Sequence, residues 1–425
     1  MKNINVYEKV KERLIRYAKI DTQSQPYSGH WPTTEKQKDL AIVLKKELMD
    51  IGISDVYLDE TNYVVYGRIP SNISDGNDKA VGFVAHMDTA PDASGTDVKP
   101  WVLENYDGKD IVLNEKEHIV MKATDYTNLE NYIGQDLILT DGTTLLGGDD
   151  KASIAAIMTM AEYLCNNKDV RHGEIALAFT PDEEVGGLAK DLDLNRFGAK
   201  CAYTLDGDHL GWYENETFYA SEAVFEFTGR SVHTGTAKDI MINAVDIAAE
   251  FIGMLPKKER PQNTDGREGF YHVISCNGDC ECSKVRLIIR DFDFDTFKKR
   301  ESFLKECAEK IGSGYGHDRV KLTINHQYSN MKEILKDVPY MTEILEAAIK
   351  KAGIRPVCEP FRGGTDGAAL SFRGLPCPNL SAGYENAHGR FEYVPIQSMV
   401  KNVEILLNIV NAYANPYLES QNDDL

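Results

Sequence analysis

Histidine and carboxylate side chains recur at the ends of short apolar runs in this sequence. They are His86 with Asp88 after 81–85, Glu183 with Glu184 after 175–180, Asp206 after 201–205 and His388 after 378–382, while Asp149 opens a helix-like stretch. In an open α/β sheet, ligands bind beyond the carboxyl ends of the strands. If the apolar runs are neighbouring strands, we expect these side chains to meet at one edge of the sheet.

Such a collection of side chains needs a cation. Neighbouring carboxylates repel one another and raise each other's pKa, and a bound cation removes that conflict. Two imidazoles with at least three carboxylates and no thiolate suit Zn²⁺, Co²⁺ or Mn²⁺. The donors outnumber the three that a single catalytic zinc usually takes, which favours two ions that share a carboxylate. We therefore expect two divalent metal ions, with Zn, Co and Mn all open at this point.

Each motif also has a simpler explanation when it is taken alone. Asp149 and Asp150 could cap the helix that follows them, because acidic side chains are favoured at a helix N-terminus. Glu183 and Glu184 could be solvated charges in a turn, Asp206 could belong to a turn with Gly207, and His388 could be a surface histidine. The coincidence of five such positions favours the metal site.

The apolar runs alternate with stretches of helical spacing. Helices are predicted over 5–19, 34–51, 151–165, 338–352 and 396–414. At 34–51, Thr34 and Gln37 form a candidate capping box and Gly52 offers a C-terminal stop. Residues 55–69 are predicted to form a hairpin. Strands that alternate with helices indicate an α/β fold with a mixed, mainly parallel sheet flanked by helices.

A different pattern occupies the middle of the chain. From 217 to 328 the predicted order is strand (222–228), helix (238–254), two strands (270–276 and 284–291), helix (295–311) and strand (318–327). This order is a split βαβ arrangement. We therefore predict a catalytic, metal-binding domain formed by 1–216 and 329–425, interrupted by a smaller α+β domain at 217–328.

Charge and cysteines narrow the class of protein. Of the 425 residues, 67 are acidic and 47 basic, a formal net charge of −20, which argues against nucleic acid as a partner. No apolar run reaches the ~20 residues of a membrane span, and the first residues lack a secretory segment. We expect a cytoplasmic protein without a membrane partner.

The cluster Cys276, Cys280 and Cys282 lacks the further ligands of a zinc site and is predicted to consist of free thiols.

Eight segments together resemble the M20 family of dinuclear zinc metallopeptidases, and within it the aminotripeptidases. They are AHMDT (85–89), LLGGDDKAS (145–153), FTPDEEVG (179–186), TLDGD (204–208), VHTGTAKD (232–239), IIRDFD (288–293), RGGTDGAALSFRGLPCPNL (362–380) and AHGRFEYVP (387–395). The match extends in order from DTQS near residue 21 almost to the C-terminus. The resemblance implies the zinc-peptidase type of fold with an inserted lid domain.

The same resemblance implies a role for each candidate residue. The metal ligands would be His86, Asp149, Glu184, Asp206 and His388. Asp149 would bridge both ions, Asp88 would tune the metal site, and Glu183 would be the general base on the attacking water. Arg362 would clamp a substrate carboxylate, and His233 and Arg290 of the inserted domain would bind the substrate and its oxyanion. Relatives often supply that histidine from a second subunit, which is the only ground for expecting a homodimer.

The activity implied is release of the N-terminal residue from tripeptides by a water activated between two metal ions. A small peptide is the expected partner. Three alternatives stay open: another M20-type amide hydrolase such as a dipeptidase or N-acyl-amino-acid deacylase, a two-metal phosphoesterase, and a binding protein with an inactive site. The sequence departs from the family's pattern at VHTG, at Gly148 and Ser153, and at AGYENAHG. The last departure adjoins His388 and bears on side-chain preference.

Overall fold

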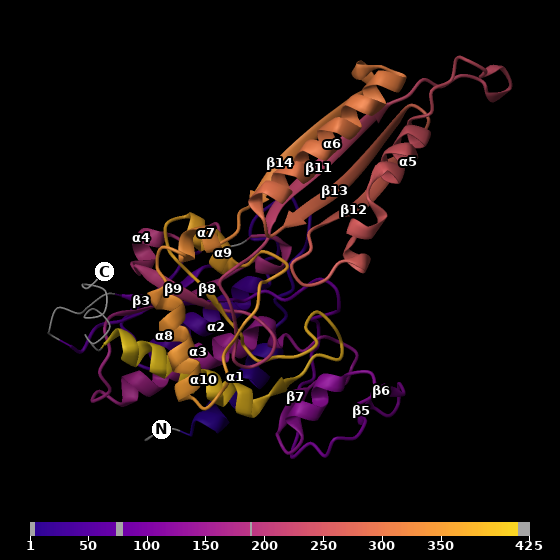
Figure 1. Cartoon of the computed structure of the whole chain (residues 1–425). Helices are drawn as coiled ribbons and strands as arrows, with labels where there is room; N and C mark the ends of the chain where they lie inside the picture. Colours follow the sequence, from indigo (N-terminus) through magenta and orange to yellow (C-terminus); the bar gives the residue numbers. More distant parts are fainter. Residues whose placement is uncertain (1–4, 74–79, 188, 415–425) are drawn as a thin grey trace. The chain divides into compact units, whose positions relative to one another are not determined.

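The computed structural model describes residues 5–73, 80–187 and 189–414, which form two compact units (Figure 1). Unit 1 contains the described residues of 1–215, 333–359 and 365–425, and unit 2 contains 216–332 and 360–364. The domain boundaries that the sequence suggested, at 216/217 and 328/329, stay a prediction.

Unit 1 is built on an eight-stranded sheet in the order β1-β2-β8-β3-β9-β16-β10-β15. The four central strands are parallel neighbours: β8 (Ile175–Thr180), β3 (Val81–His86), β9 (Cys201–Leu205) and β16 (Asn379–Leu380). The outer strands are β1 (Asp55–Leu58), β2 (Val65–Ile69), β10 (Trp212–Glu214) and β15 (Val357–Cys358). β2 is antiparallel to β8, and β10 is antiparallel to β16. The predicted mixed, mainly parallel sheet is confirmed.

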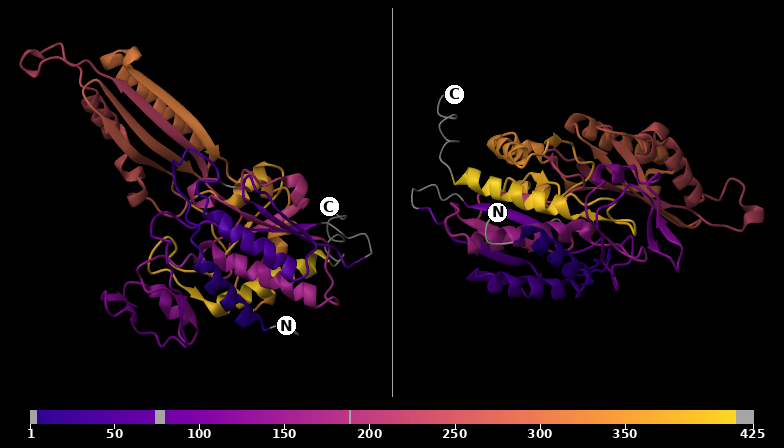
Figure 2. Two further views of the ribbon diagram at one scale, coloured as in Figure 1. Left: turned by 180° about the vertical axis from the view of Figure 1, so that it is seen from behind. Right: turned by 90° about the horizontal axis from the view of Figure 1, so that it is seen from below.

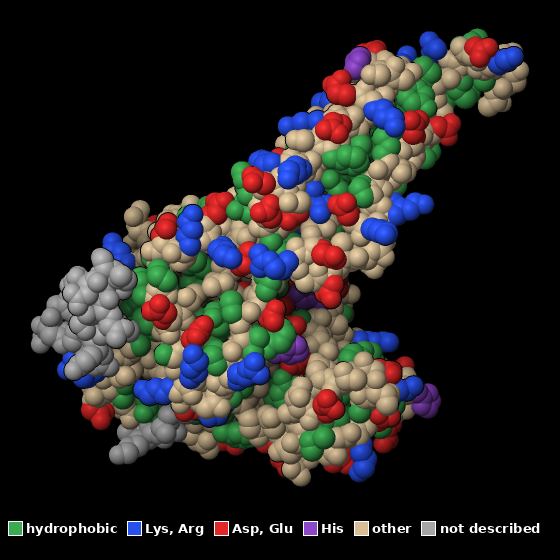
Figure 3. Space-filling view, viewed as in Figure 1, with side chains coloured by type: hydrophobic (Ala, Val, Ile, Leu, Met, Phe, Trp, Pro, Cys, Tyr) green, Lys and Arg blue, Asp and Glu red, His purple; other side chains and the backbone are tan. Residues whose placement is uncertain are grey.

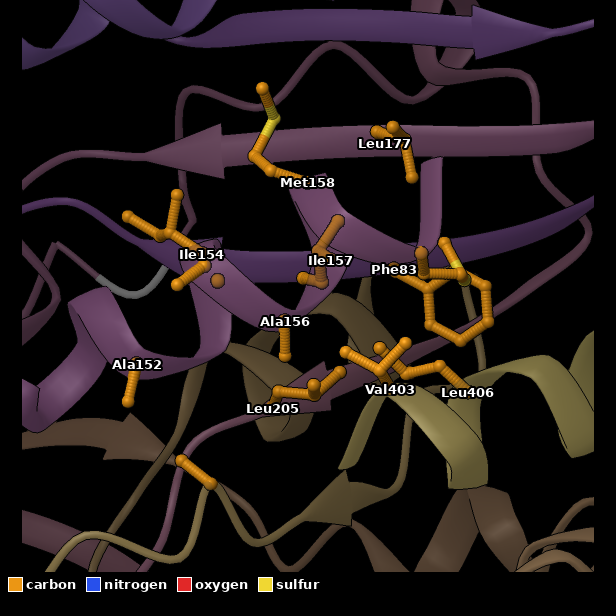
Figure 4. Packing of buried hydrophobic residues seen from close by; sticks show 14 of the residues in the cluster. Phe83, Ala152, Ile154, Ala156, Ile157, Met158, Leu177, Leu205, Val403 and Leu406 are labelled. Carbon is orange, nitrogen blue, oxygen red and sulfur yellow. The ribbon is translucent and has the colours of Figure 1, made fainter. Parts of the chain in front are cut away.

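Helices cover both faces of this sheet (Figures 1 and 2). One face packs against α1 (Val6–Ala18), α2 (Gln37–Asp50), α3 (Gly148–Asn166), α8 (Tyr340–Lys351) and α10 (Ile396–Tyr413). The other face packs against α4 (Leu194–Phe197) and α9 (Asp366–Phe372). Figure 4 shows Phe83 and Leu177 of the sheet with Ile157 of α3 and Val403 of α10. The burial of both faces explains why β3, β8 and β9 consist mostly of apolar residues.

The predicted capping box of the second helix is wrong. α2 begins at Gln37 after Lys36, and no side chain caps it. The Thr34 hydroxyl donates to the carbonyl oxygen of Gln23 at 2.9 Å and accepts from Gln37 Nε2 at 3.2 Å. Gly52 has a φ of +100°, a conformation that favours glycine, and it follows the helix as expected.

Two small sheets in unit 1 escaped prediction. β4 (Trp101–Leu103), β7 (Leu137–Leu139) and β17 (Val394–Pro395) form an antiparallel sheet in the order β17-β7-β4. β5 (Ile111–Asn114) and β6 (Ile119–Met121) form a hairpin. Strands of two to four residues are too short to show a clear alternation. The pairing of β17 with β7 nevertheless brings two distant segments of the chain together.

Unit 2 is a four-stranded antiparallel sheet with two helices on one face. Its strands, in the order β12-β13-β11-β14, are β12 (Phe270–Gly278), β13 (Cys282–Asp291), β11 (Tyr219–Thr228) and β14 (Val320–Tyr328). Its helices are α5 (Ala244–Met254) and α6 (Phe294–Tyr315), while α7 (Lys332–Leu335) follows β14. The split βαβ order is as expected, but α5 starts at 244 and not at 238, because the Asn243 side chain caps it by accepting from the N–H of Val245.

None of the described helices is long and apolar enough to cross a membrane. On the face that Figure 3 shows, basic and acidic side chains are interspersed and form no large basic patch. The eight cysteines all lie among the described residues, and none of them forms a disulfide.

Arg13 joins three helices of unit 1. Its guanidinium donates to Glu47 at 2.7 Å, to Thr159 at 2.7 Å and to Glu162 at 2.6 Å, and the side chain is 4% exposed. We expect Arg13→Ala to lower the free energy of unfolding by about 3 kcal/mol, because it leaves largely buried carboxylates without this partner. Denaturant unfolding measures the change. Lys46→Ala, which removes an exposed ion pair with Asp50, is the control, and an equal effect of both variants would contradict the prediction.

Candidate metal centre

Asp149 lies between two imidazoles in unit 1. One of its carboxylate oxygens is 3.1 Å from Nε2 of His86, and the other is 3.2 Å from Nε2 of His388. The same nitrogen of His388 is 2.9 Å from a carboxylate oxygen of Glu184. Asp149 therefore offers one oxygen to each side of the site, as a bridging carboxylate would.

Two overlapping groups of donor atoms surround His86. The potential ligand atoms of His86, Asp149 and Glu184 all lie within 4.8 Å of one another, and so do those of His86, Glu183 and Asp206. The Tyr384 hydroxyl donates to Asp206 at 2.9 Å. The structure thus brings together every residue that the sequence suggested as a metal ligand, together with Glu183.

The parallel strands explain this convergence. His86 ends β3, Asp206 follows β9, and Glu183 begins a short 3-10 turn (Glu183–Val185) just after β8. These strands are neighbours that run in the same direction, so that their carboxyl ends share one edge. Asp149 lies in the first turn of α3, and His388 lies in a loop after β16. The loops that were expected to meet at one edge do meet there.

Asp88 supports two parts of this edge of the sheet, the His86 side chain and the turn after β8. It is fully buried, and one carboxylate oxygen lies 3.4 Å from Nδ1 of His86. Its two oxygens also accept the backbone N–H groups of Glu183 at 3.0 Å and Glu184 at 3.2 Å. A single carboxylate thereby contacts both the imidazole and the turn that carries the two glutamates.

The site holds more negative charge than its imidazoles balance. Burial, and then repulsion from Asp206, raises the pKa of Glu183 well above its usual range. Burial and the nearby Asp149 raise the pKa of Glu184 to about 8 and that of Asp206 to about 6. The Oε1 atom of Glu184 is buried without a hydrogen-bond partner among the described residues.

The same carboxylates favour the charged form of the neighbouring histidine. Hydrogen bonds to Asp149 and Glu184 raise the pKa of His388 to about 11. Burial alone would raise the pKa of Asp149, but the hydrogen bonds from His388 and His86 lower it. A divalent cation would relieve the carboxylate repulsion and occupy the free Glu184 oxygen, and the nitrogen and oxygen donors suit Zn²⁺, Co²⁺ or Mn²⁺. The residues present therefore fit such ions.

The three residues predicted to bind substrate belong to unit 2. His233 is exposed, and its Nδ1 accepts the N–H of Gly235 at 3.1 Å. Arg290 on β13 lies over the ring of Tyr328. Arg362 donates within unit 2, to the Glu268 carbonyl oxygen and the Thr264 hydroxyl at 3.0 Å each. Their roles toward a substrate, and the homodimer, stay predictions.

Sequence reasoning missed three side chains within four residues of His388: Tyr384, Glu385 and Glu392. Glu385 is buried, accepts from Asn128 Nδ2 at 2.5 Å, and lies 2.8 Å from Nδ1 of His209. Glu392 is also buried and accepts three backbone N–H groups. The signal available in the sequence was their proximity to His388, but spacing does not distinguish a buried carboxylate from a solvated one.

A mainly parallel α/β sheet whose strand ends gather imidazoles and carboxylates around a shared aspartate has the arrangement of a metal-dependent hydrolase. The family model described as "Peptidase family M20/M25/M40" matches residues 146–412. The chain belongs to this peptidase family.

Curated relatives agree over almost the whole chain. Peptidase T of Geobacillus thermodenitrificans is 48% identical over 402 residues, which cover 95% of this chain and 97% of that protein. Peptidase T of Clostridium botulinum is 48% identical over 406 residues, which cover 96% of this chain and 99% of that protein. This chain is therefore similar in length as well as in sequence to these peptidases.

Solved structures show the same fold. Aminopeptidase PepT from Bacillus cereus superposes with a TM-score of 0.76 at 23% identity, covering 97% of this chain and 100% of that one. A tripeptidase from Staphylococcus aureus superposes with a TM-score of 0.75 at 21% identity, and the match covers 97% of this chain and 99% of that one. A Bacillus subtilis protein is described as a dinuclear metal binding peptidase of the M20 family. It superposes with a TM-score of 0.64 at 11% identity, and the match covers 96% of this chain and 98% of that one. The expected zinc-peptidase type of fold with an inserted domain is confirmed.

Proposed function

We propose that this protein is a metal-dependent aminopeptidase that releases the N-terminal residue of tripeptides. The observation that carries the proposal is the position of Asp149 between His86 and His388, with Glu183 and Glu184 beside them. The tripeptide substrate is supported by the nearly full-length similarity to proteins named peptidase T.

Two divalent ions, with zinc as the first candidate, would be held by five side chains of unit 1. These are His86, Asp149, Glu184, Asp206 and His388. When bound, such ions supply Lewis acidity that lowers the pKa of water and polarises a peptide carbonyl. Asp149 would be the ligand shared by both ions, because its two oxygens face different imidazoles.

Glu183 is proposed as the general base. Its carboxylate takes a proton from the attacking water and delivers it to the nitrogen of the leaving amine. Burial and the neighbouring Asp206 raise its pKa, so this side chain is able to hold a proton between the two transfers. Asp88 keeps the group in place, because it accepts the Glu183 N–H while it contacts His86.

A substrate-length series tests the proposal. We expect hydrolysis of tripeptides with a free N-terminus to exceed that of matched dipeptides, tetrapeptides and N-acetyl amino acids, with the N-terminal residue as the first product. Dialysis against a chelator should abolish the activity, and Zn²⁺, Co²⁺ or Mn²⁺ should restore it. Faster hydrolysis of dipeptides or N-acetyl amino acids would favour a different M20-type amide hydrolase, and unchanged activity after complete metal removal would contradict the metal site.

A further inference from the structure

Residues 385–393 form a closed loop with His388 near its middle. At the base of the loop, the N–H of Glu385 donates to the Tyr393 carbonyl oxygen at 2.9 Å, and the N–H of Tyr393 donates back at 3.1 Å. β17 begins at Val394, directly after this base, and pairs with Ile138 of β7. The loop that carries one histidine of the site is therefore anchored to the strand that leads toward Asp149.

Glu392 contacts the turn of Asp149 directly. One of its carboxylate oxygens accepts the N–H groups of Leu146 at 2.8 Å and Gly147 at 2.7 Å, and the other accepts the N–H of Asp149 itself at 2.9 Å. These groups precede or begin α3, where backbone N–H groups have no acceptor within the helix. Since Glu392 is only 2% exposed, water does not compete for them.

This contact joins two distant parts of the site. Asp149 must present one oxygen toward His86 and the other toward His388, so a small rotation of its turn would spoil one of the two approaches. Glu392 lies four residues beyond His388 in the same closed loop. Its carboxylate therefore sets the position of Asp149 relative to the loop that holds His388.

We propose that Glu392 is a positioning residue of the metal centre, which aligns Asp149 with His388 and thereby sets the affinity for the metal ions. This proposal rests on the proposed function, because that function requires the metal ions. Groups that orient metal ligands typically contribute about 10–100-fold in metal affinity.

The loop provides its own matched control. Glu385 is a second buried carboxylate at the base of the same loop, but its partners are Asn128, Tyr132 and His209, outside the turn of Asp149. A purely structural role in closing the loop would make Glu385→Gln and Glu392→Gln equivalent. A role in aligning Asp149 would separate the two variants.

The test is a titration of the metal-free full-length chain with Co²⁺, followed by its visible absorption. We expect Glu392→Gln to bind Co²⁺ about 10–100-fold more weakly than wild type and with an altered spectrum, while Glu385→Gln stays close to wild type. Wild-type affinity in Glu392→Gln, or an equal loss in both variants, would overturn the inference. A wild-type chain that binds no Co²⁺ would overturn the proposed function instead.

A second pair of variants covers a failure of Glu392→Gln to fold. Glu392→Asp keeps both oxygens and the charge but shortens the side chain by one methylene group, and Glu385→Asp does the same at the control position. We expect the first variant to bind Co²⁺ more weakly than the second. Equal affinities in this pair would also overturn the inference.

Discussion

Replacing Glu183 with glutamine should lower kcat on a tripeptide by about 10²–10⁴-fold, the range that general acid–base catalysis contributes. The amide has the size of the carboxylate but does not accept the proton of the attacking water. The backbone N–H of residue 183 still donates to Asp88, so the turn keeps its place. We therefore expect the metal content of the purified variant to equal that of wild type.

The neighbouring glutamate is the control for this prediction. Glu184→Gln changes the same turn by the same chemistry, but Glu184 lies 2.9 Å from His388 and belongs to the proposed ligand set. It should lose metal as well as activity. Metal analysis beside steady-state kinetics separates the two roles, and nearly full activity of Glu183→Gln would show that another group is the base.

Replacing Asp149 with alanine should remove both metal binding and activity. Among the described residues, Asp149 is the only one whose carboxylate pairs with both His86 and His388, through one oxygen to each. Without this carboxylate, two ions would lose a common ligand and would repel each other more strongly. We expect fewer than two metal ions per chain and no measurable hydrolysis of tripeptides.

Asp141→Ala is the control for this second prediction. Asp141 lies in the segment between β7 and α3, where it pairs with Lys99 at 3.1 Å, outside both donor groups. It should keep wild-type metal content and activity. Two ions per chain in Asp149→Ala, measured by elemental analysis, would remove the bridging role proposed for Asp149.

The sequence predicted that side chains at the ends of regular strands would meet at one site. His86, Glu184 and Asp206 follow three apolar runs that form adjacent parallel strands, and the carboxyl ends of such strands meet at one edge. Their order along the chain and their chemistry were sufficient for this inference. His388 follows a strand of only two residues, so its placement depended more on the motif around it.

Apart from the contact of Asp88 with His86, the supporting contacts were not predictable, because they depend on irregular structure. Glu392 reaches the Asp149 turn through the pairing of β17 with β7, and β17 is two residues long. Arg362 belongs to the short segment 360–364 that joins unit 2, although its neighbours on both sides belong to unit 1. A segment of five residues is too short to show a periodic pattern, so the sequence does not indicate that it belongs to unit 2. The sequence thus indicated the proposed ligands and the supporting Asp88, but not the supporting Glu392.

The order of the proposed ligands along the chain has a consequence for folding. His86, Asp149, Glu184 and Asp206 all precede unit 2, and His388 follows it. A growing polypeptide emerges from its N-terminus, and contacts between distant residues form late because closing long loops costs entropy. During synthesis, the four donors that precede unit 2 are therefore made first, and His388 is added only after the whole of unit 2. If these five side chains are the metal ligands, a product truncated before residue 388 would lack one of them and would bind the ions more weakly.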